Sequence, residues 1–187
     1  MSAAGLDMSH DWIGRPLPEN IEVGENCFIQ SAYVFGLFRS RRAPGLVMGA
    51  GSGLYSQSQL VVGERGLVTL GPFACLNSAT IQCEQQVTIG AHCLLAWGVV
   101  ISDCLIESGA EIQAGPPDAW QRLPACPDPA PVVLEDNVWV GFGSVILPGV
   151  TIGEGSIIGS RSVIREDVPA YTVIAGDPAV GIRSLTP

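Results

Sequence analysis

Apolar residues recur at intervals of six along this chain, most clearly between residues 138 and 168. The aliphatic positions in this stretch are Val140, Ile146, Ile152, Ile158 and Ile164. A small or β-branched residue stands two positions before each of them, and a glycine often follows. An α-helix would space its apolar residues three and four apart, and an ordinary strand would alternate every two residues without a longer repeat. A hexad made of a short strand and a tight turn accounts for the pattern, so the sequence predicts a parallel β-helix.

The same period extends towards the N-terminus, interrupted at regular places. The apolar positions come in groups of three: Val23, Ile29 and Phe35, then Met48, Leu54 and Leu60, then Leu70 and Leu76, then Ile89, Leu95 and Ile101, then Leu134, Val140 and Ile146, then Ile152, Ile158 and Ile164. Three strands per turn make a triangular coil, and such coils stack ~4.8 Å apart. We therefore predict an all-β fold, a triangular prism of about six coils. The third coil is the weakest, because Gln82 stands where an aliphatic residue is expected.

The residues between the groups of three are expected to leave the prism at one corner. They are the segments 36–47, 61–69, 83–88 and 102–133. Insertions in a repeat scaffold collect on one face and carry binding groups, so function is expected at this corner. The longest, 102–133, is rich in proline and glycine and is predicted to protrude as a loop, in which Trp120 either anchors on a neighbouring subunit or covers the base of the loop.

The repeat divides the chain into three parts, namely an N-terminal arm or cap at 1–20, the β-helix at 21–176 and a C-terminal tail at 177–187. Beyond the arm, the arginines Arg39, Arg41 and Arg42 follow a run of aromatic residues. Two interpretations stay open for this N-terminal region. It either covers an acceptor site, where the arginines would meet a carboxylate or phosphate, or it seals the open end of the prism and protects its edge strand.

Composition narrows the class of protein. With 187 residues, a formal net charge of -9, 23 glycines and 14 prolines, the chain is predicted to be one compact, turn-rich acidic domain. It has no run of 18 apolar residues and no basic, apolar secretion signal, so we expect a soluble cytoplasmic protein that does not enter a membrane. The acidic balance argues against a nucleic-acid partner.

The six cysteines do not form a CxxC pair, and only two histidines accompany them. Cys27 and Cys93 fall in the small inward slots of their hexads, which favours buried free thiols over disulfides. We predict no metal site from these residues.

Two segments resemble the hexapeptide-repeat acyltransferases, particularly the sugar O-acetyltransferase branch. They read AHCLLAWGVVISD and EDNVWVGFGSVILPGVTIGEGSIIGSRSVIREDVPAYTVIAGDPAVGI. The resemblance implies a left-handed β-helix, a homotrimer, and an acyl-CoA donor that lies between neighbouring subunits with its thioester near the long loop. It further implies transfer of an acyl group, here acetyl from acetyl-CoA, to a hydroxyl or amine of a small, sugar-like acceptor.

The resemblance also assigns candidate donor-binding residues. Trp139 corresponds to the family's tryptophan beside the acyl site, although it equally suits a cap on the hydrophobic column. The backbone around Phe142 and Ser160 corresponds to turns that meet the pantetheine amides. Ala175 and Gly176 match a turn that lies against the donor, or one that simply ends the helix.

Phosphate groups of the donor require cations, and Arg161, Arg165 and Arg183 gather near the end of the repeat. Two departures reduce the expected phosphate contacts. Glu166 stands where the family usually has lysine, and Val180 where it has lysine or arginine.

The family's catalytic histidine has no counterpart here. Its position falls on Glu107 or on Gly115, depending on where the loop gap is placed. The two histidines, His10 and His92, are expected to have solvated surface roles. Two histidines at unrelated phases also argue against the zinc-dependent γ-class carbonic anhydrases, which use the same prism with three histidines.

Three interpretations therefore remain. In the first, Glu107 or Asp103 acts as the general base, with a pKa raised by burial at a subunit interface. In the second, the acceptor is an amine that attacks once deprotonated, and the site supplies positioning and oxyanion donors. In the third, the protein is catalytically inactive and serves as a ligand-binding or assembly subunit.

Overall fold

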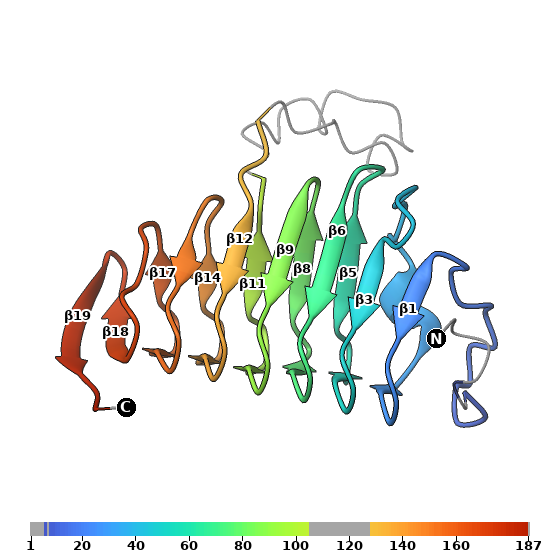
Figure 1. Ribbon diagram of the computed structural model, residues 1–187, viewed down its shortest axis with the longest axis horizontal. Helices are drawn as coiled ribbons and strands as arrows, with labels where there is room; N and C mark the ends of the chain where they lie inside the picture. Colours follow the sequence, from blue (N-terminus) through green and yellow to red (C-terminus); the bar gives the residue numbers. More distant parts are fainter. Residues whose placement is uncertain (1–5, 7, 105–127, 187) are drawn as a thin grey trace.

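The computed structural model describes residues 6, 8–104 and 128–186, and in it the chain winds as a left-handed parallel β-helix with three sheets. We call the sheets A, B and C, in the order in which each coil visits them. Figure 1 shows the strands side by side along one long axis, from β1 at one end to β19 at the other. Sheet A has 6 strands, one per coil, so the prediction of about six coils is confirmed.

The strands are short, as the hexad requires. Sheet A contains β1 (Ile21–Val23), β3 (Leu46–Met48), β6 (Leu67–Leu70), β9 (Gln86–Ile89), β12 (Val132–Leu134) and β15 (Thr151–Ile152). Sheet B contains β2 (Phe28–Ile29), β4 (Gly53–Tyr55), β7 (Cys75–Asn77), β10 (Leu94–Leu95), β13 (Trp139–Val140), β16 (Ile157–Ile158), β18 (Thr172–Gly176) and β19 (Ala179–Ser184). Sheet C contains β5 (Gln59–Val62), β8 (Thr80–Cys83), β11 (Val100–Ser102), β14 (Val145–Ile146) and β17 (Val163–Ile164). In the first coil the 3-10 helix η2 (Ala32–Phe35) takes the place of a sheet C strand.

The predicted inward positions form the core. Val140, Ile146, Ile152, Ile158 and Ile164 are all 1% exposed or less, and the small residues two positions before them are buried with them. Parallel strands of successive coils hold these residues in register, so each aliphatic side chain stacks on its counterpart in the next coil. The hexad therefore encodes a continuous column of apolar side chains.

Two predicted core positions were wrong by one residue. In the third coil Ile81, and not Gln82, points inward and aligns with Leu60 and Ile101. The turn after β7 is one residue shorter than the hexad requires, so the next inward residue arrives early. The same shortening occurs in the first coil, where Val34 is buried and Phe35 is only half-buried.

The insertions leave the prism at one corner, as predicted. The segments that follow Phe38, β5, β8 and β11 all connect sheet C to sheet A. The part of the longest insertion that the structure describes comprises residues 102–104 and 128–133. The candidate Glu107 and Trp120 lie outside the described residues.

Each passage from sheet A to sheet B contains one residue with positive φ. These residues are Asn26, Gly51, Phe73, His92, Asn137, Gly155 and Tyr171. A left-handed residue is what makes the chain turn sharply between two short strands. His92, with φ +56°, is therefore a turn residue of the scaffold.

The N-terminal arm covers the first coil. Leu6, Met8 and Leu17 pack against the core, which supports the interpretation of the arm as a cap. Asp11 fastens it by accepting hydrogen bonds from the Ala32 amide (3.0 Å) and the Ser31 hydroxyl (2.9 Å). Burial raises the pKa of Asp11, whereas hydrogen bonds from the Ala32 and Ile13 amides and the Ser31 hydroxyl lower it. The lowering is the larger effect, so the net pKa lies below the ordinary value.

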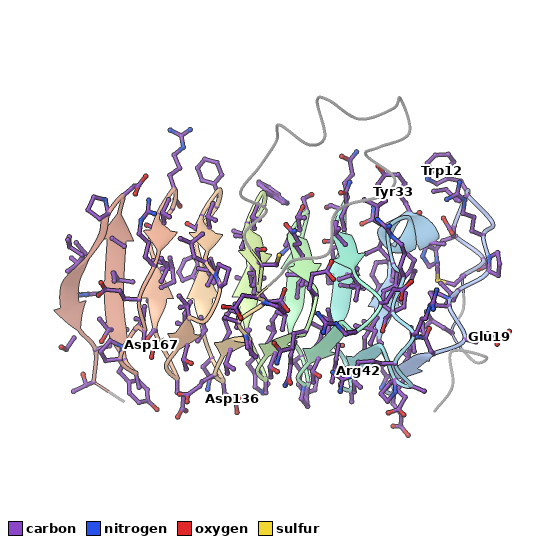
Figure 2. All side chains as sticks on the ribbon, turned by 90° about the horizontal axis from the view of Figure 1, so that it is seen from above. Trp12, Glu19, Tyr33, Arg42, Asp136 and Asp167 are labelled. Atoms are coloured by element: carbon purple, nitrogen blue, oxygen red, sulfur yellow. The ribbon has the colours of Figure 1, made fainter. Side chains whose placement is uncertain are left out.

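Replacing Asp11 with asparagine is expected to loosen this cap. The wild-type carboxylate has a lowered pKa in the folded state, so its contribution is complete above the ordinary aspartate pKa and is lost as the pH falls through the lowered value. Hydrogen exchange of the Ala32 amide should accelerate several-fold at neutral pH, because its acceptor is weakened. Glu19→Gln, an exposed change in the same arm (Figure 2), is the control and should leave the exchange unchanged.

The C-terminal tail forms an ordered hairpin. β19 pairs antiparallel with β18 and so extends sheet B by one strand, with Arg183 opposite Val173. The segment around Gly176 is thus the turn that ends the parallel helix. Nowhere in the described part of the chain is there a helix long and apolar enough to cross a membrane.

Four of the cysteines are free, as expected: Cys27, Cys75, Cys83 and Cys93. Burial raises the pKa of the Cys93 thiol to about 11, which keeps it protonated and unreactive. Cys104, however, is disulfide-bonded, so the expectation of free thiols was wrong for this residue. It lies just beyond β11 and is buried.

Candidate functional site

The corner between sheets B and C brings together an aromatic ring and a cation. Phe142 is 45% exposed, and the Arg161 guanidinium carbon lies 5.1 Å from the centre of its ring. The Arg161 amide donates to the Phe142 carbonyl (2.8 Å), so the backbone of one coil fixes the turn of the next. Arg161 has a φ of +58°, which makes it the left-handed residue of its turn. Its side chain reaches the Phe142 ring of the preceding coil.

A second row of candidates crosses the outer face of sheet B. Trp139 is in register with Ile157 of the next coil, Ile157 with Val173, and Val173 with Arg183. Adjacent strands are ~4.8 Å apart, so Arg183 lies about three strand spacings from Trp139. Trp139 is 50% exposed. The interpretation of Trp139 as a cap on the core column is therefore not supported, because its side chain is on the outside of the prism.

Ser160, Ala175 and Gly176 lie close to the same corner. The Gly159 amide donates to the Ile174 carbonyl (2.8 Å), and the Gly176 amide donates to the Ser162 hydroxyl (3.0 Å). Any side chain at Gly159 would lie 2.6 Å from the Ala175 methyl group, so glycine is required for this close approach. The structure thus brings five of the predicted residues together at one corner: Phe142, Ser160, Arg161, Ala175 and Gly176.

Arg165 points elsewhere. It follows β17 and forms an exposed ion pair with Asp177 in the hairpin turn, at 3.2 Å. The three arginines therefore share the last coils of the prism but lie at different places on them. Arg161 is at the corner of sheets B and C, Arg183 is on sheet B, and Arg165 is beside the hairpin.

The side chain of Asp103 is buried and hydrogen-bonded to the backbone. Its side chain is 0% exposed, and its carboxylate accepts the backbone amides of Glu84 (2.7 Å), Gln85 (2.7 Å) and Gln86 (2.8 Å). The Asp103 carbonyl also accepts the Ala130 amide (2.8 Å), at the neck of the long insertion. Since both carboxylate oxygens are occupied and buried, this geometry favours an anchoring role over contact with an acceptor.

Glu84 is the carboxylate that the structure adds to the candidates. It lines a cavity of about 330 Å³ at the corner between sheets C and A, together with Arg39, Arg65 and Glu64. Burial and the negative charge of Asp103 raise the pKa of Glu84, while Arg39 and Arg65 oppose that shift. Its carboxylate rests on Gly63, where any side chain would collide with it. A half-buried carboxyl group of raised pKa beside a cavity is suited to proton transfer.

Glu84 is not recognisable as a candidate from the sequence, because it stands in the short turn between β8 and β9 with no motif around it. The available signal was its place among the insertions at 83–88, on the corner where function was expected. Two of the lining residues already have partners, because Glu64 pairs with Arg41 at 2.8 Å and Arg39 also has a bonding partner.

Both histidines have surface roles, as expected. The His10 ring stacks on Phe28 with centroids 5.3 Å apart and its Nε2 bonds to the Ile29 carbonyl at 2.9 Å. The exposed His92 stacks on Phe73 at 5.1 Å. Within the described residues, no three histidine, cysteine or acidic side chains are grouped so as to hold a metal ion.

Residues 131–166 match the family model described as bacterial transferase hexapeptide (six repeats). A putative acetyltransferase of Schizosaccharomyces pombe is 51% identical over 55 residues, which is 29% of this chain and 27% of that protein. The galactoside O-acetyltransferase of Lactococcus lactis subsp. lactis is 28% identical over 166 residues, covering 88% of this chain and 63% of the relative. Among solved structures, a hexapeptide-repeat acetyltransferase of Vibrio cholerae complexed with acetyl coenzyme A aligns with a TM-score of 0.60 at 26% identity, covering 76% of this chain and 72% of the other.

The chain spans less than two thirds of the length of these two sequence relatives. The solved Vibrio cholerae protein is a hexapeptide-repeat acetyltransferase, and its fold aligns with the prism described above. Over residues 131–166 the chain is similar to the bacterial hexapeptide transferases, and its prism is similar to that of a solved hexapeptide-repeat acetyltransferase.

Proposed function

We propose that this protein transfers an acetyl group from acetyl-CoA to a hydroxyl or amine of a small, sugar-like acceptor. The observation that carries the proposal is the corner of sheets B and C, where Arg161 stacks on Phe142 beside Ser160, Ala175 and Gly176. A solved family member at 26% identity was complexed with acetyl coenzyme A, and a relative is a galactoside O-acetyltransferase. These comparisons support both the donor and the class of acceptor.

In this proposal the donor runs along the corner. Arg161, Arg165 and Arg183 provide cations for its phosphate groups, and Arg165 would exchange its exposed pairing with Asp177 for a phosphate. The amides of Gly143 and Arg161 already donate to the Trp97 and Phe142 carbonyls, so they are not available to the pantetheine. The backbone at Phe142 and Ser160 then supplies the pantetheine contacts, and Trp139 borders the acyl group.

The acceptor is proposed to bind at the corner of sheets C and A. The cavity there has a volume of about 330 Å³, within the range of small-molecule sites. Glu84 would accept the proton of the acceptor hydroxyl, or of the neutral amine, as its oxygen or nitrogen attacks the thioester carbonyl and the CoA thiolate leaves. Asp103 acts as a positioning residue, because it holds the Glu84 amide at 2.7 Å. Glu107 remains a candidate base outside the described residues.

The two corners lie on different edges of one prism, so the reaction requires a neighbouring copy. We propose a homotrimer in which the sheet B and C corner of one subunit faces the sheet C and A corner of the next. Sedimentation equilibrium of the purified protein tests the trimer. A cytoplasmic location is likewise part of the proposal and is tested by fractionation of the source cells.

Replacing Arg161 and Arg183 with alanine tests the donor site. Loss of charge-assisted hydrogen bonds, each contributing about 1.5–3 kcal/mol, should raise the dissociation constant for CoA by roughly tenfold or more per arginine. The measurement is calorimetric titration with CoA and with acetyl-CoA. Arg15→Ala, an exposed arginine of the N-terminal arm, should leave the constant unchanged. An equal constant in all variants would remove these arginines from the site.

An inactive ligand-binding or assembly subunit is the alternative function. The observation that favours it is the engagement of both histidines and of Asp103 in contacts within the scaffold. Wild-type protein that binds no CoA at millimolar concentration would support this alternative.

A further inference from the structure

Trp97 is a large apolar side chain exposed to solvent. It is 66% exposed, more than Trp139 or Phe142, and lies in the turn between β10 and β11. A single exposed apolar side chain is common on protein surfaces, whereas a contiguous exposed patch marks a binding surface. Whether Trp97 belongs to a binding surface therefore depends on the side chains around it.

Trp97 belongs to the same corner as the proposed donor site. Trp97, Phe142 and Ser160 each stand just before the left-handed residue of their turn, which is Gly98, Gly143 and Arg161 respectively. The Gly143 amide donates to the Trp97 carbonyl (2.9 Å), as the Arg161 amide does to Phe142. Trp97, Phe142 and Ser160 thus occupy equivalent positions in three consecutive coils. With a coil spacing of ~4.8 Å, Trp97 lies about 10 Å along the prism from Arg161.

The surroundings of Trp97 are apolar and uncharged. Leu94 and Trp139 are paired in register on the adjoining strands and are 39% and 50% exposed. Segments 93–102 and 138–149 contain no charged residue, although the protein carries a net charge of -9. A Cβ at Gly98 would have only backbone atoms of Gly143 within reach, at 3.9 Å, so the surface beside Trp97 is open. The corner thus passes from a cation at Arg161 to an uncharged aromatic surface at Trp97.

We infer that Trp97, together with Leu94 and Trp139, forms a subsite for the hydrocarbon chain of the acyl group, so that the protein accepts acyl groups longer than acetyl. This inference rests on the proposed function, because Arg161 marks the phosphate end of the donor. The phosphate groups and the acyl group are at opposite ends of the pantetheine arm. The apolar end of the corner therefore corresponds to the acyl end of the donor. An alkyl chain matches a surface without charge, whereas the polar acceptor does not.

The test is calorimetric titration of wild-type protein with CoA, acetyl-CoA and butyryl-CoA. Each buried methylene contributes a factor of about four, so butyryl-CoA should bind roughly fifteenfold more tightly than acetyl-CoA. Trp97→Ala should abolish most of this preference and change the dissociation constant for CoA itself by less than about twofold. Trp12→Ala is the matched control, since Trp12 is 86% exposed and lies in the N-terminal arm (Figure 2). It should keep the preference.

The other outcomes are distinct. A wild-type protein that binds no CoA overturns the proposed function and this inference with it. CoA binding without a chain-length preference, or a preference that survives in Trp97→Ala, overturns the inference alone. Trimers that dissociate in Trp97→Ala while the preference persists would show that Trp97 contacts a second copy of the chain, which also overturns it.

Discussion

Replacing Asp103 with alanine is expected to lower the free energy of unfolding by about 3–6 kcal/mol. The carboxylate is fully buried and accepts three backbone amides from the turn between β8 and β9. Alanine would leave all three donors without their acceptor, and a hydrogen bond to a charged group is worth about 1.5–3 kcal/mol before non-additivity is considered. Urea unfolding followed by circular dichroism, at one fixed protein concentration, measures the change.

The matched controls are Asp136→Ala and Asp167→Ala. Both carboxylates are exposed (Figure 2), and each accepts one backbone amide across coils, from Ala91 and Thr151, at 2.7 Å. Each control should cost about 0.5–1.5 kcal/mol, because water can replace the lost acceptor. Equal losses in all three variants would contradict the anchoring role of Asp103. A stable Asp103→Ala variant without activity would instead return Asp103 to the candidates for the base.

Replacing Glu84 with glutamine is expected to reduce kcat by roughly 10²–10⁴-fold, the usual contribution of a general base. Glutamine keeps the shape and the contact with Gly63 but cannot accept a proton. The raised pKa of Glu84 means that the wild-type rate should increase as the pH rises through that value, since the base must be ionised. The assay follows release of the CoA thiol from acetyl-CoA with a panel of galactosides and amino sugars.

Glu22→Gln, an exposed change on sheet A, is the control for loss of one negative charge and should retain the wild-type rate and pH profile. The dissociation constant for acetyl-CoA should stay the same in Glu84→Gln, because the proposed donor site is at the other corner. Unchanged kcat in Glu84→Gln would indicate that the acceptor is an amine that attacks unaided, or that Glu107 is the base.

The fold was predictable because the aliphatic residue of each hexad marks the position that points into the core. Val140, Ile146, Ile152, Ile158 and Ile164 identify the column directly, since the strand-and-turn unit repeats with little variation. The errors at Gln82 and Phe35 arose where a turn loses one residue. The polar side chain of Gln82 marked the first of these changes, whereas Phe35 is itself apolar and gave no sign of the second.

The positions of the candidate donor-binding residues were predictable to the extent that these residues follow the repeat. Phe142 and Ser160 occupy the same place in successive hexads, so their common corner follows from the period. The direction of Arg165 towards Asp177 did not follow, because it depends on a hairpin that folds back after the parallel coils end.

The sequence by itself determined the prism, its number of coils and the corner from which the insertions leave, because these depend on local spacing that repeats every six residues. Tertiary structure alone decided the environments of Asp103 and Glu84. The Asp103 carboxylate binds the turn of the preceding coil, and Glu84 acquires its raised pKa from burial and from that same carboxylate. Such contacts join residues that lie about one coil apart in the sequence, and only the stacking of coils brings them together.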